Sequence, residues 1–144
     1  MANPAIPFEL DRRLAGDTLP VAPMDSGPLL LMNDRRWPWL ILVPAMISNG
    51  VGAVELHDLA PETARRVHEE TDQVSAALKQ VTGCTKINSG ALGNVVRQLH
   101  VHVIARSEGD ANWPGPVWGF GERVAWEMDE ARGFIDKIRT ALGR

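Results

Sequence analysis

Alternating polar and apolar side chains in residues 98–104 (QLHVHVI) constrain the fold of this chain more than any other feature. In a β-strand, successive side chains point to opposite faces of the sheet. Gln98, His100 and His102 are therefore expected on one face, opposite an apolar stripe that would pack into the core. The β-branched residues that recur through residues 95–105 predict one long strand over the whole of that segment.

A long amphipathic helix is predicted for residues 61–81. Pro61 suits the first helical position, Glu62 suits the first turn, and apolar residues then recur at steps of three and four. Gly83 is a typical residue for ending a helix. The charged residues are expected on the solvent-exposed face: Arg65, Arg66, Glu69, Glu70, Asp72 and Lys79.

The remaining segments indicate an α+β fold. Apolar runs at residues 29–33 and 39–44 predict an antiparallel hairpin, and residues 85–88 predict a further strand. Residues 8–14 predict a short helix that ends at Gly16 and Asp17, residues 113–119 a loop rich in proline and glycine, and residues 123–142 a last helix. We expect one domain over residues 1–144, an antiparallel sheet with a long helix packed on it and a C-terminal helix.

Composition narrows the classes of partner and compartment. The 144 residues carry 15 basic and 18 acidic side chains, a net charge of −3, which gives no general attraction to nucleic acid or to an anionic membrane. Cys84 is the single cysteine and has no partner for an intramolecular disulfide. Residues 1–7 lack the pattern of a signal peptide, and residues 37–53 are too interrupted for a membrane span. A cytoplasmic protein is expected.

Three interpretations suit the polar stripe of residues 98–102. His100 and His102 are spaced to bind one metal ion, which needs a third ligand such as His57, His68 or Asp110. Alternatively, one neutral imidazole attacks phosphorus while the neighbouring imidazole and the Gln98 amide hold phosphate oxygens. The third interpretation is a half-exposed strand face with two solvated histidines.

Glycines just before the stripe favour a phosphate site beside it. Gly90 and Gly93 lie in the loop of residues 89–94 and allow the backbone to approach a ligand closely. Consecutive backbone N–H groups in such a loop can bind an anion. Glycine loops also occur in ordinary turns, so this signal depends on the histidines that follow it.

The residues from Asn88 to Ile104 resemble the signature of the histidine triad (HIT) superfamily, in which histidines alternate with apolar residues. The resemblance covers roughly residues 29–110. Within the superfamily, residues 93–102 (GNVVRQLHVH) and residues 113–119 (WPGPVWG) are most similar to a bacterial branch described as diadenosine tetraphosphate hydrolase-like. The resemblance implies a HIT-like fold and a homodimer.

The same resemblance implies a reaction and a set of site residues. Proteins of this family split or transfer nucleoside monophosphates, for example from dinucleoside polyphosphates. The resemblance implies that they do so through a nucleotide bound covalently to the middle histidine, here His100. His102 and Gln98 would complete the catalytic group, with His102 bonding the phosphate or protonating the leaving group. Substrate contacts are expected at Asn33 or Asp34 for the ribose, and at Asn88, Gly93 and Asn94 for the phosphates. A histidine nucleophile requires no metal or other cofactor.

Three positions depart from the family pattern. Gln98 stands in the place of the first histidine, Val95 in that of a phosphate-binding serine or threonine, and Trp39 in that of a further histidine. These changes are compatible with a slow or selective hydrolase, or alternatively with a catalytically weak or inactive dimer that binds nucleotides. The tryptophans of residues 113–118 either pack over the sheet or the dimer contact, or form a surface for a partner protein. His57 and His68 have no evident functional partner.

Overall fold

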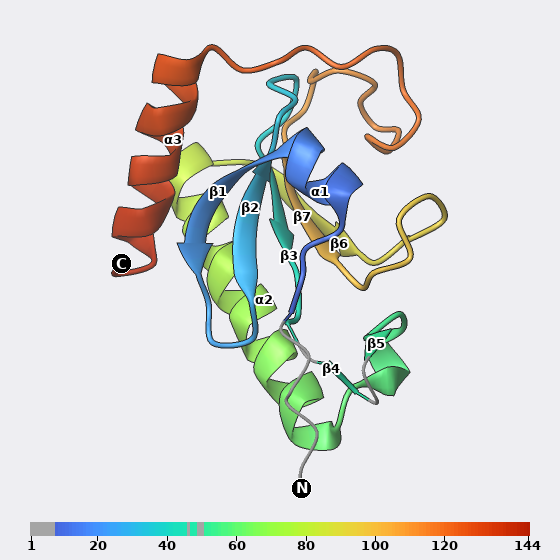
Figure 1. Cartoon of the computed structure of the whole chain (residues 1–144). Helices are drawn as coiled ribbons and strands as arrows, with labels where there is room; N and C mark the ends of the chain where they lie inside the picture. Colours follow the sequence, from blue (N-terminus) through green and yellow to red (C-terminus); the bar gives the residue numbers. More distant parts are fainter. Residues whose placement is uncertain (1–7, 46, 49–50) are drawn as a thin grey trace, which may run out of the picture.

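A five-stranded antiparallel sheet forms the centre of the protein, with α2 and α3 on one face (Figure 1). The computed structural model describes residues 8–45, 47–48 and 51–144. In spatial order the strands are β1 (Thr18–Pro23), β2 (Pro28–Met32), β3 (Trp39–Leu42), β7 (Val101–Arg106) and β6 (Lys86–Gly90). The helices are α1 (Arg12–Asp17), α2 (Pro61–Thr82) and α3 (Met128–Ala141), with a 3₁₀ turn at Leu56–Asp58 and a separate pair, β4 (Ile47–Ser48) and β5 (Val51–Gly52). The α+β fold is confirmed.

The predicted hairpin is β2 and β3, and it divides the apolar core in two. Leu30 lies opposite Ile41 in an antiparallel register, and both strands are buried. One set of alternate residues packs against α2 and α3: Leu29, Leu31, Leu40 and Leu42, together with Val101, Val103 and Ala105 of β7. The other set packs on the opposite face with Leu14 of α1 and Val117. The histidines of the sequence motif lie on this second face.

The long helix α2 follows the sequence prediction almost to the residue. It begins at Pro61 and extends one residue beyond the predicted end, to Thr82. Gly83 then adopts a φ of +64°, and its N–H donates to the Lys79 carbonyl at 2.8 Å. A residue with a side chain is strained in that left-handed conformation, which explains why glycine ends the helix here.

Glu70 of α2 is buried, contrary to the prediction that it faces solvent. Its carboxylate accepts hydrogen bonds from the Ser26 backbone N–H, at 3.1 and 3.2 Å, and from the Ser26 hydroxyl. Ser26 lies in the turn between β1 and β2, where the backbone needs an acceptor in a buried position. Glu70 therefore fastens this turn to the helix, an energetically costly burial that its hydrogen bonds compensate.

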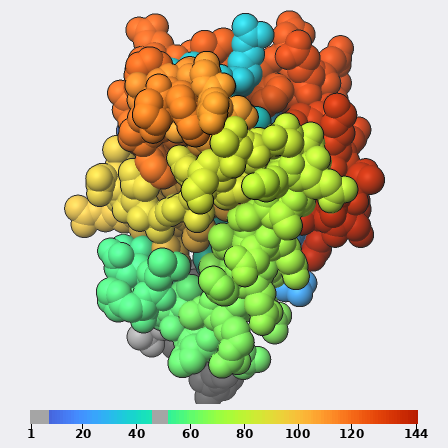
Figure 2. Space-filling view, turned by 180° about the vertical axis from the view of Figure 1, so that it is seen from behind, coloured from blue at the N-terminus to red at the C-terminus, as the bar shows by residue number. Residues whose placement is uncertain are grey.

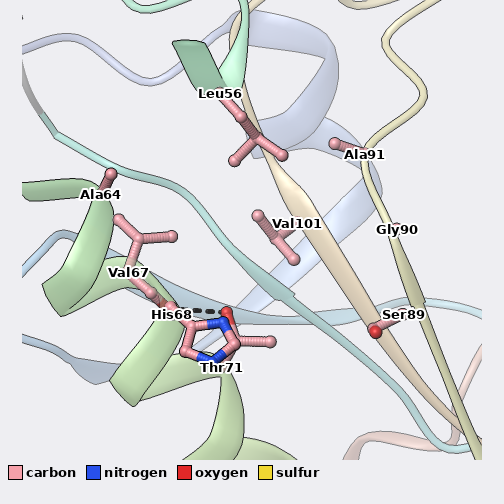
Figure 3. A pocket seen from close by; sticks show the side chains of 9 residues that line it. All are labelled: Leu56, Ala64, Val67, His68, Thr71, Ser89, Gly90, Ala91 and Val101. Carbon is pink, nitrogen blue, oxygen red and sulfur yellow. Dashed lines mark hydrogen bonds between the residues drawn. The ribbon is translucent and has the colours of Figure 1, made fainter. Parts of the chain in front are cut away.

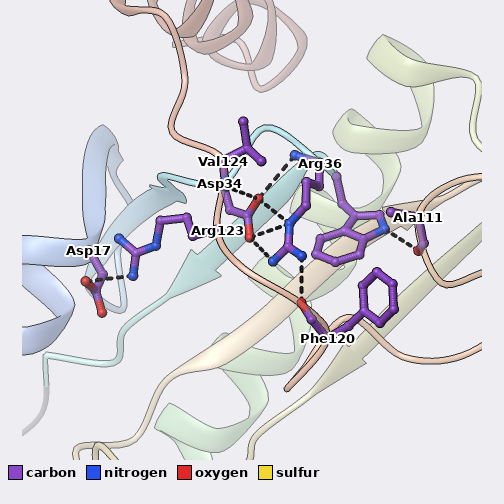
Figure 4. Close-up of polar contacts among 8 residues, drawn as sticks. Asp17, Asp34, Arg36, Ala111, Phe120, Arg123 and Val124 are labelled. Carbon is purple, nitrogen blue, oxygen red and sulfur yellow. Dashed lines mark hydrogen bonds and ion pairs between the residues drawn. The ribbon is translucent and has the colours of Figure 1, made fainter.

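The C-terminal helix begins at Met128, five residues later than predicted. The chain before it runs beside the end of the β2–β3 hairpin instead. The Val124 N–H donates to the Asp34 carboxylate at 3.4 Å, the Trp126 N–H donates to Asn33 Oδ1 at 2.9 Å, and the Arg35 N–H donates to the Val124 carbonyl at 2.7 Å. The Trp126 N–H and the Val124 carbonyl are thus bonded outside the helix that was predicted to include them. Figure 4 shows Val124 beside Asp34.

Two further predictions were wrong in the residues they covered. The helix expected at residues 8–14 is α1, which begins after Asp11, whose carboxylate accepts from the Arg13 and Leu14 N–H groups. It continues through Gly16 and leads directly into β1, a strand that the sequence analysis did not predict. The long strand expected at residues 95–105 begins only at Val101, because residues 91–100 form an irregular loop.

Within the described residues, no helix is long and apolar enough to cross a membrane. The expectation about residues 1–7 lies outside the described residues, as does part of the apolar stretch at residues 37–53. All five strands of the large sheet and the helices α2 and α3 share one core. The expectation of a single domain over residues 1–144 stays a prediction.

Candidate active site

His100 and His102 lie together on the sheet face opposite α2, as the alternating pattern predicts. His102 is in β7, opposite Ile41 of β3, and His100 immediately precedes β7. Both residues are buried, with 6% and 5% of their surface exposed. Their ring centroids are 4.8 Å apart at an interplanar angle of 67°. This burial is inconsistent with two solvated histidines, the third interpretation of the stripe.

The hydrogen bond of His100 fixes which of its ring nitrogens carries the proton. Nδ1 lies 2.7 Å from the backbone carbonyl oxygen of Gln98. Because a carbonyl oxygen only accepts, neutral His100 must carry its proton on Nδ1 and donate it there. The lone pair is then on Nε2, the nitrogen that is available to attack an electrophile. His100 thus has the arrangement of an oriented nucleophile.

His102 has the opposite tautomer. The indole Nε1–H of Trp39 donates to His102 Nδ1 at 2.9 Å, so the proton of the neutral His102 ring is on Nε2. Burial, followed by the neighbouring His100, lowers the pKa of His102 from 6.5 to about 3. His102 is therefore uncharged at neutral pH, with an N–H group for a ligand.

Gln98 contributes through its backbone, and its side chain lies elsewhere than predicted. The side-chain amide donates to the Glu9 carbonyl at 3.0 Å and accepts from the Asp11 N–H at 2.9 Å. These two bonds hold the segment before α1 against the loop that precedes His100. The carbonyl of Gln98, a group that every residue has, orients His100. The amide contact with His100 or phosphate that the sequence suggested is replaced by this backbone contact.

Of the proposed phosphate contacts, Asn88 is the one that shares a sheet face with the histidines. It lies in β6 opposite Ile104, and Gly90 of the same strand lies opposite His102. Residues directly opposite each other in an antiparallel pair have side chains on the same face. Gly93, at φ +76°, and the exposed Asn94 lie in the loop that connects β6 to His100. Their contacts with phosphate stay predictions.

Asn33 and Asp34 directly follow β2, and their side chains form hydrogen bonds and an ion pair with other residues of the protein. Asn33 accepts from Trp126, as described above, and Asp34 forms an ion pair with Arg36 at 2.7 Å (Figure 4). Burial raises the pKa of Asp34, but hydrogen bonds from Arg36 and from backbone N–H groups outweigh it and hold that pKa below 3.8. Both side chains thus position the segment before α3, and a ribose contact stays a prediction.

The ring of Trp118 packs against the ring of His102. The two ring centroids are 5.3 Å apart in an edge-to-face arrangement, and the indole Nε1 is buried with no hydrogen-bond partner in the described part of the chain. The tryptophan-rich loop therefore packs over the sheet, in agreement with the first of the two alternatives for residues 113–118. Trp39, His102 and Trp118 form a continuous cluster of aromatic rings beside His100, in tilted and edge-to-face contacts.

A buried arginine that the sequence analysis gave no role holds this loop in place. Arg106, at 1% exposure, donates to both carboxylate oxygens of Asp110, at 2.7 and 2.8 Å, and to the Gly115 carbonyl at 2.7 Å. Its guanidinium also lies 5.6 Å from the Trp113 ring centroid. In the sequence, the one indication of a role for Arg106 is that a charged residue directly follows an apolar run. The pairing with Asp110 required the fold.

A cavity of about 370 Å³ lies on the other face of the sheet (Figure 3). Val101 points into it from β7, while Val67 and His68 line it from α2 and Leu56 from the 3₁₀ turn. Val101 points away from the face of His100 and His102, so this cavity is separate from the histidine site. Within the described residues, no group of three or more His, Cys, Asp or Glu side chains is arranged to bind a metal ion.

Comparisons with known proteins agree on the family. The HIT domain matches residues 23–109. A histidine triad protein from Sinorhizobium meliloti is 51% identical, with a TM-score of 0.89 and coverage of 93% of this chain and 96% of that one. One from Bradyrhizobium japonicum is 40% identical, with a TM-score of 0.90 and coverage of 95% and 99%. One from Marinobacter aquaeolei is 38% identical, with a TM-score of 0.89 and coverage of 95% and 97%. A search of curated proteins found no match. The chain belongs to the histidine triad (HIT) family.

Proposed function

We propose that the protein is a nucleotide hydrolase or nucleotidyltransferase that acts through a covalent nucleotidyl-histidine at His100. Its substrates are dinucleoside polyphosphates or related nucleotide conjugates, as expected for the diadenosine tetraphosphate hydrolase-like branch. The observation that carries this proposal is the bond between His100 Nδ1 and the Gln98 carbonyl, which directs the lone pair of the ring to Nε2. An imidazole oriented in this way is suited to nucleophilic attack.

In the first step, His100 Nε2 attacks the α-phosphorus of the nucleotide. The Nε2–P bond forms as the P–O bond to the leaving phosphate breaks, and the electron pair of that bond departs with the oxygen. The ring of the adduct keeps its Nδ1–H and carries a positive charge, which the Gln98 carbonyl stabilises. A water molecule or another acceptor then attacks phosphorus, the N–P electron pair returns to Nε2, and solvent takes the acceptor's proton.

His102 and the β6 loop supply hydrogen-bond donors for the phosphate. The Nε2–H of His102 is free to donate, because Trp39 already occupies Nδ1. The amide of Asn88, and backbone N–H groups near Gly93 and Asn94, are proposed to bind the remaining phosphate oxygens. Uncharged donors held in place before the reaction stabilise the charge that develops on phosphate.

The alternative is a HIT protein that binds nucleotides without turning them over. Val95, at the position of the family's phosphate-binding hydroxyl, is 71% exposed and has no donor, and the Gln98 amide is engaged with residues 9 and 11. Loss of one fixed donor costs about 10²–10³ in rate in other enzymes. This observation favours slow turnover, and in the extreme case binding alone.

Hydrolysis of diadenosine tetraphosphate in ¹⁸O-labelled water distinguishes the two functions. If His100 attacks the α-phosphorus, the products are AMP and ATP, and mass spectrometry finds the label in AMP only. Attack by water elsewhere in the phosphate chain yields two molecules of ADP or labelled ATP and contradicts the proposal. Calorimetric binding with no product after hours supports the binding protein instead.

We also propose that the protein is a homodimer that joins two copies along β6 and α2. Because β6 is the last strand of the sheet, its outer edge is unpaired within the described residues, and such edges readily pair with another strand. The cavity lined by Val67, Val101 and Ala91 lies beside this edge, and Figure 2 shows that side of the molecule, along which α2 runs. Leu56, which also lines this cavity, is 52% exposed.

Substitution of Ala91 by arginine is expected to separate the two copies. The long cationic side chain would stand at the edge of the apolar surface, where it loses hydration on association. Light scattering coupled to size-exclusion chromatography should give the mass of a dimer for the original protein and about half of it for Ala91→Arg. Lys137→Glu, on the exposed face of α3, should leave the dimer intact. A monomeric original protein, or an unchanged mass for Ala91→Arg, contradicts this interface.

A further inference from the structure

Trp39 contacts His102 through a single directed hydrogen bond. Trp39 begins β3 and lies opposite Ile104 in β7. The pair of Ile41 and His102 lies two residues further along each strand, on the same face of the sheet. From this diagonal position its indole Nε1–H reaches His102 Nδ1 at 2.9 Å, with ring centroids 5.6 Å apart. Trp39 is 6% exposed, so its ring is fixed by the core around it.

An indole at this position can only donate a hydrogen bond to His102, whereas a histidine could either donate or accept one. The indole nitrogen donates a hydrogen bond and has no lone pair with which to accept one. An imidazole partner could exchange donor and acceptor roles with His102 and could take up a proton near neutral pH. With Trp39 in place, His102 Nδ1 is always the acceptor and the proton of His102 is always on Nε2.

The other groups around His102 also disfavour a charged ring. His100 lies on one side, at 4.8 Å between centroids, and the ring of Trp118 lies on another, at 5.3 Å. Within the described residues, the ion pairs that involve histidine are formed by His57 and His68, both exposed, and none by His102. In the described part of the chain, no carboxylate pairs with His102 to stabilise its protonated form, and burial, followed by the neighbouring His100, lowers its pKa to about 3.

We propose that Trp39 is a positioning residue that fixes His102 as an uncharged hydrogen-bond donor to the phosphate, so that His102 does not protonate the leaving group. The inference rests on the proposed function and deepens it. A neutral imidazole donates a hydrogen bond through Nε2–H but is far too weak an acid to transfer that proton. The leaving group must then depart as a weak base, as the phosphate of a polyphosphate does, or carry its own proton.

Nitrogen NMR on the full-length protein tests the hydrogen bond without any turnover. In ¹⁵N-labelled protein, a through-bond coupling between Trp39 Nε1 and His102 Nδ1 is expected, together with the shift of an unprotonated Nδ1. Trp39→Phe should abolish the coupling. Trp118→Phe, which removes the other indole against His102 and no hydrogen bond, should preserve it. A protonated His102 Nδ1, or no coupling in the original protein, overturns the proposal.

Kinetics with adenosine 5′-phosphate esters of substituted phenols test the role of His102. A donor to the phosphate helps all esters alike, whereas a proton donor to the leaving group helps the most basic leaving groups most. We expect Trp39→Phe to lower kcat/KM by about 10- to 100-fold through misplacement of His102. His102→Ala should lower kcat/KM further. For each of the two variants, the loss should be the same for all esters of the series.

A loss that grows with the basicity of the leaving group in either variant overturns the proposal, because it shows that His102 delivers a proton. Normal rates for Trp39→Phe with a folded protein also overturn it. If the original protein splits none of these esters, the proposed hydrolase function fails. The nitrogen coupling alone then decides whether Trp39 fixes His102, so the two failures are distinguishable.

Discussion

His100→Ala should lower the turnover of diadenosine tetraphosphate by about 10⁴-fold or more, because, of the two histidines on this face, His100 is the one that the described contacts orient for attack on phosphorus. His102 cannot replace it, since its lone pair is occupied by Trp39 and its Nε2 carries the proton. Product release measured by chromatography gives the rate. His102→Ala, which removes a donor and leaves the nucleophile, should keep part of the activity.

The space left by the His100 ring provides a control for this prediction. Because the ring is almost fully buried, its removal leaves a cavity in which free imidazole can bind and attack the same phosphorus. Imidazole added to His100→Ala should restore part of the turnover and release a nucleotidyl-imidazole. A variant that is folded by circular dichroism and retains more than about a tenth of the original rate would contradict the assignment of His100.

Arg106→Met should destabilise the protein by about 3–5 kcal/mol, because it leaves the buried partners of the guanidinium without donors. Asp110 and the Gly115 carbonyl both lose a hydrogen bond of 2.7 Å, and the loop that carries Trp118 loses its attachment to β7. Urea denaturation measures the free energy of unfolding. Turnover should fall as well, at temperatures where the variant is folded, because Trp118 no longer packs on His102.

Arg132→Met is the matched control for this substitution. Its partner Asp129 lies 3.5 Å away on the exposed face of α3, and both side chains are largely exposed. An ion pair in that setting contributes about 0–1 kcal/mol, so its loss should change the free energy of unfolding little. Equal effects of the two substitutions would show that the Arg106 cluster contributes no more than a surface ion pair.

The sequence predicted those elements in which one physical requirement dominates. The helix α2 has apolar residues at a helical spacing, a proline at its start and a glycine after its end, and these local signals agree. The alternation around His100 and His102 correctly placed both rings on one face. It did so although regular strand structure begins only at Val101. The same alternation failed at Gln98, whose side chain bonds residues 9 and 11 instead.

Features that depend on distant partners escaped prediction. The burial of Glu70 requires the turn at Ser26, 44 positions away along the chain, and β1 contains two prolines that argue against a strand. The bond from Trp39 to His102 joins residues 63 positions apart, and no local pattern indicates it. For the same reason, the side chain of Gln98 was expected beside His100, whereas residues 9 and 11 bind it.

The covalent intermediate is the central claim, and intact-protein mass spectrometry tests it most directly. The protein is incubated briefly with diadenosine tetraphosphate, quenched under mildly basic conditions that preserve a phosphorus–nitrogen bond, and weighed beside His100→Ala. We predict an added mass of one adenylyl group on the original protein and none on the variant. An adduct of the same size on His100→Ala, or product formation by the original protein with no adduct under rapid quenching, would contradict covalent catalysis by His100.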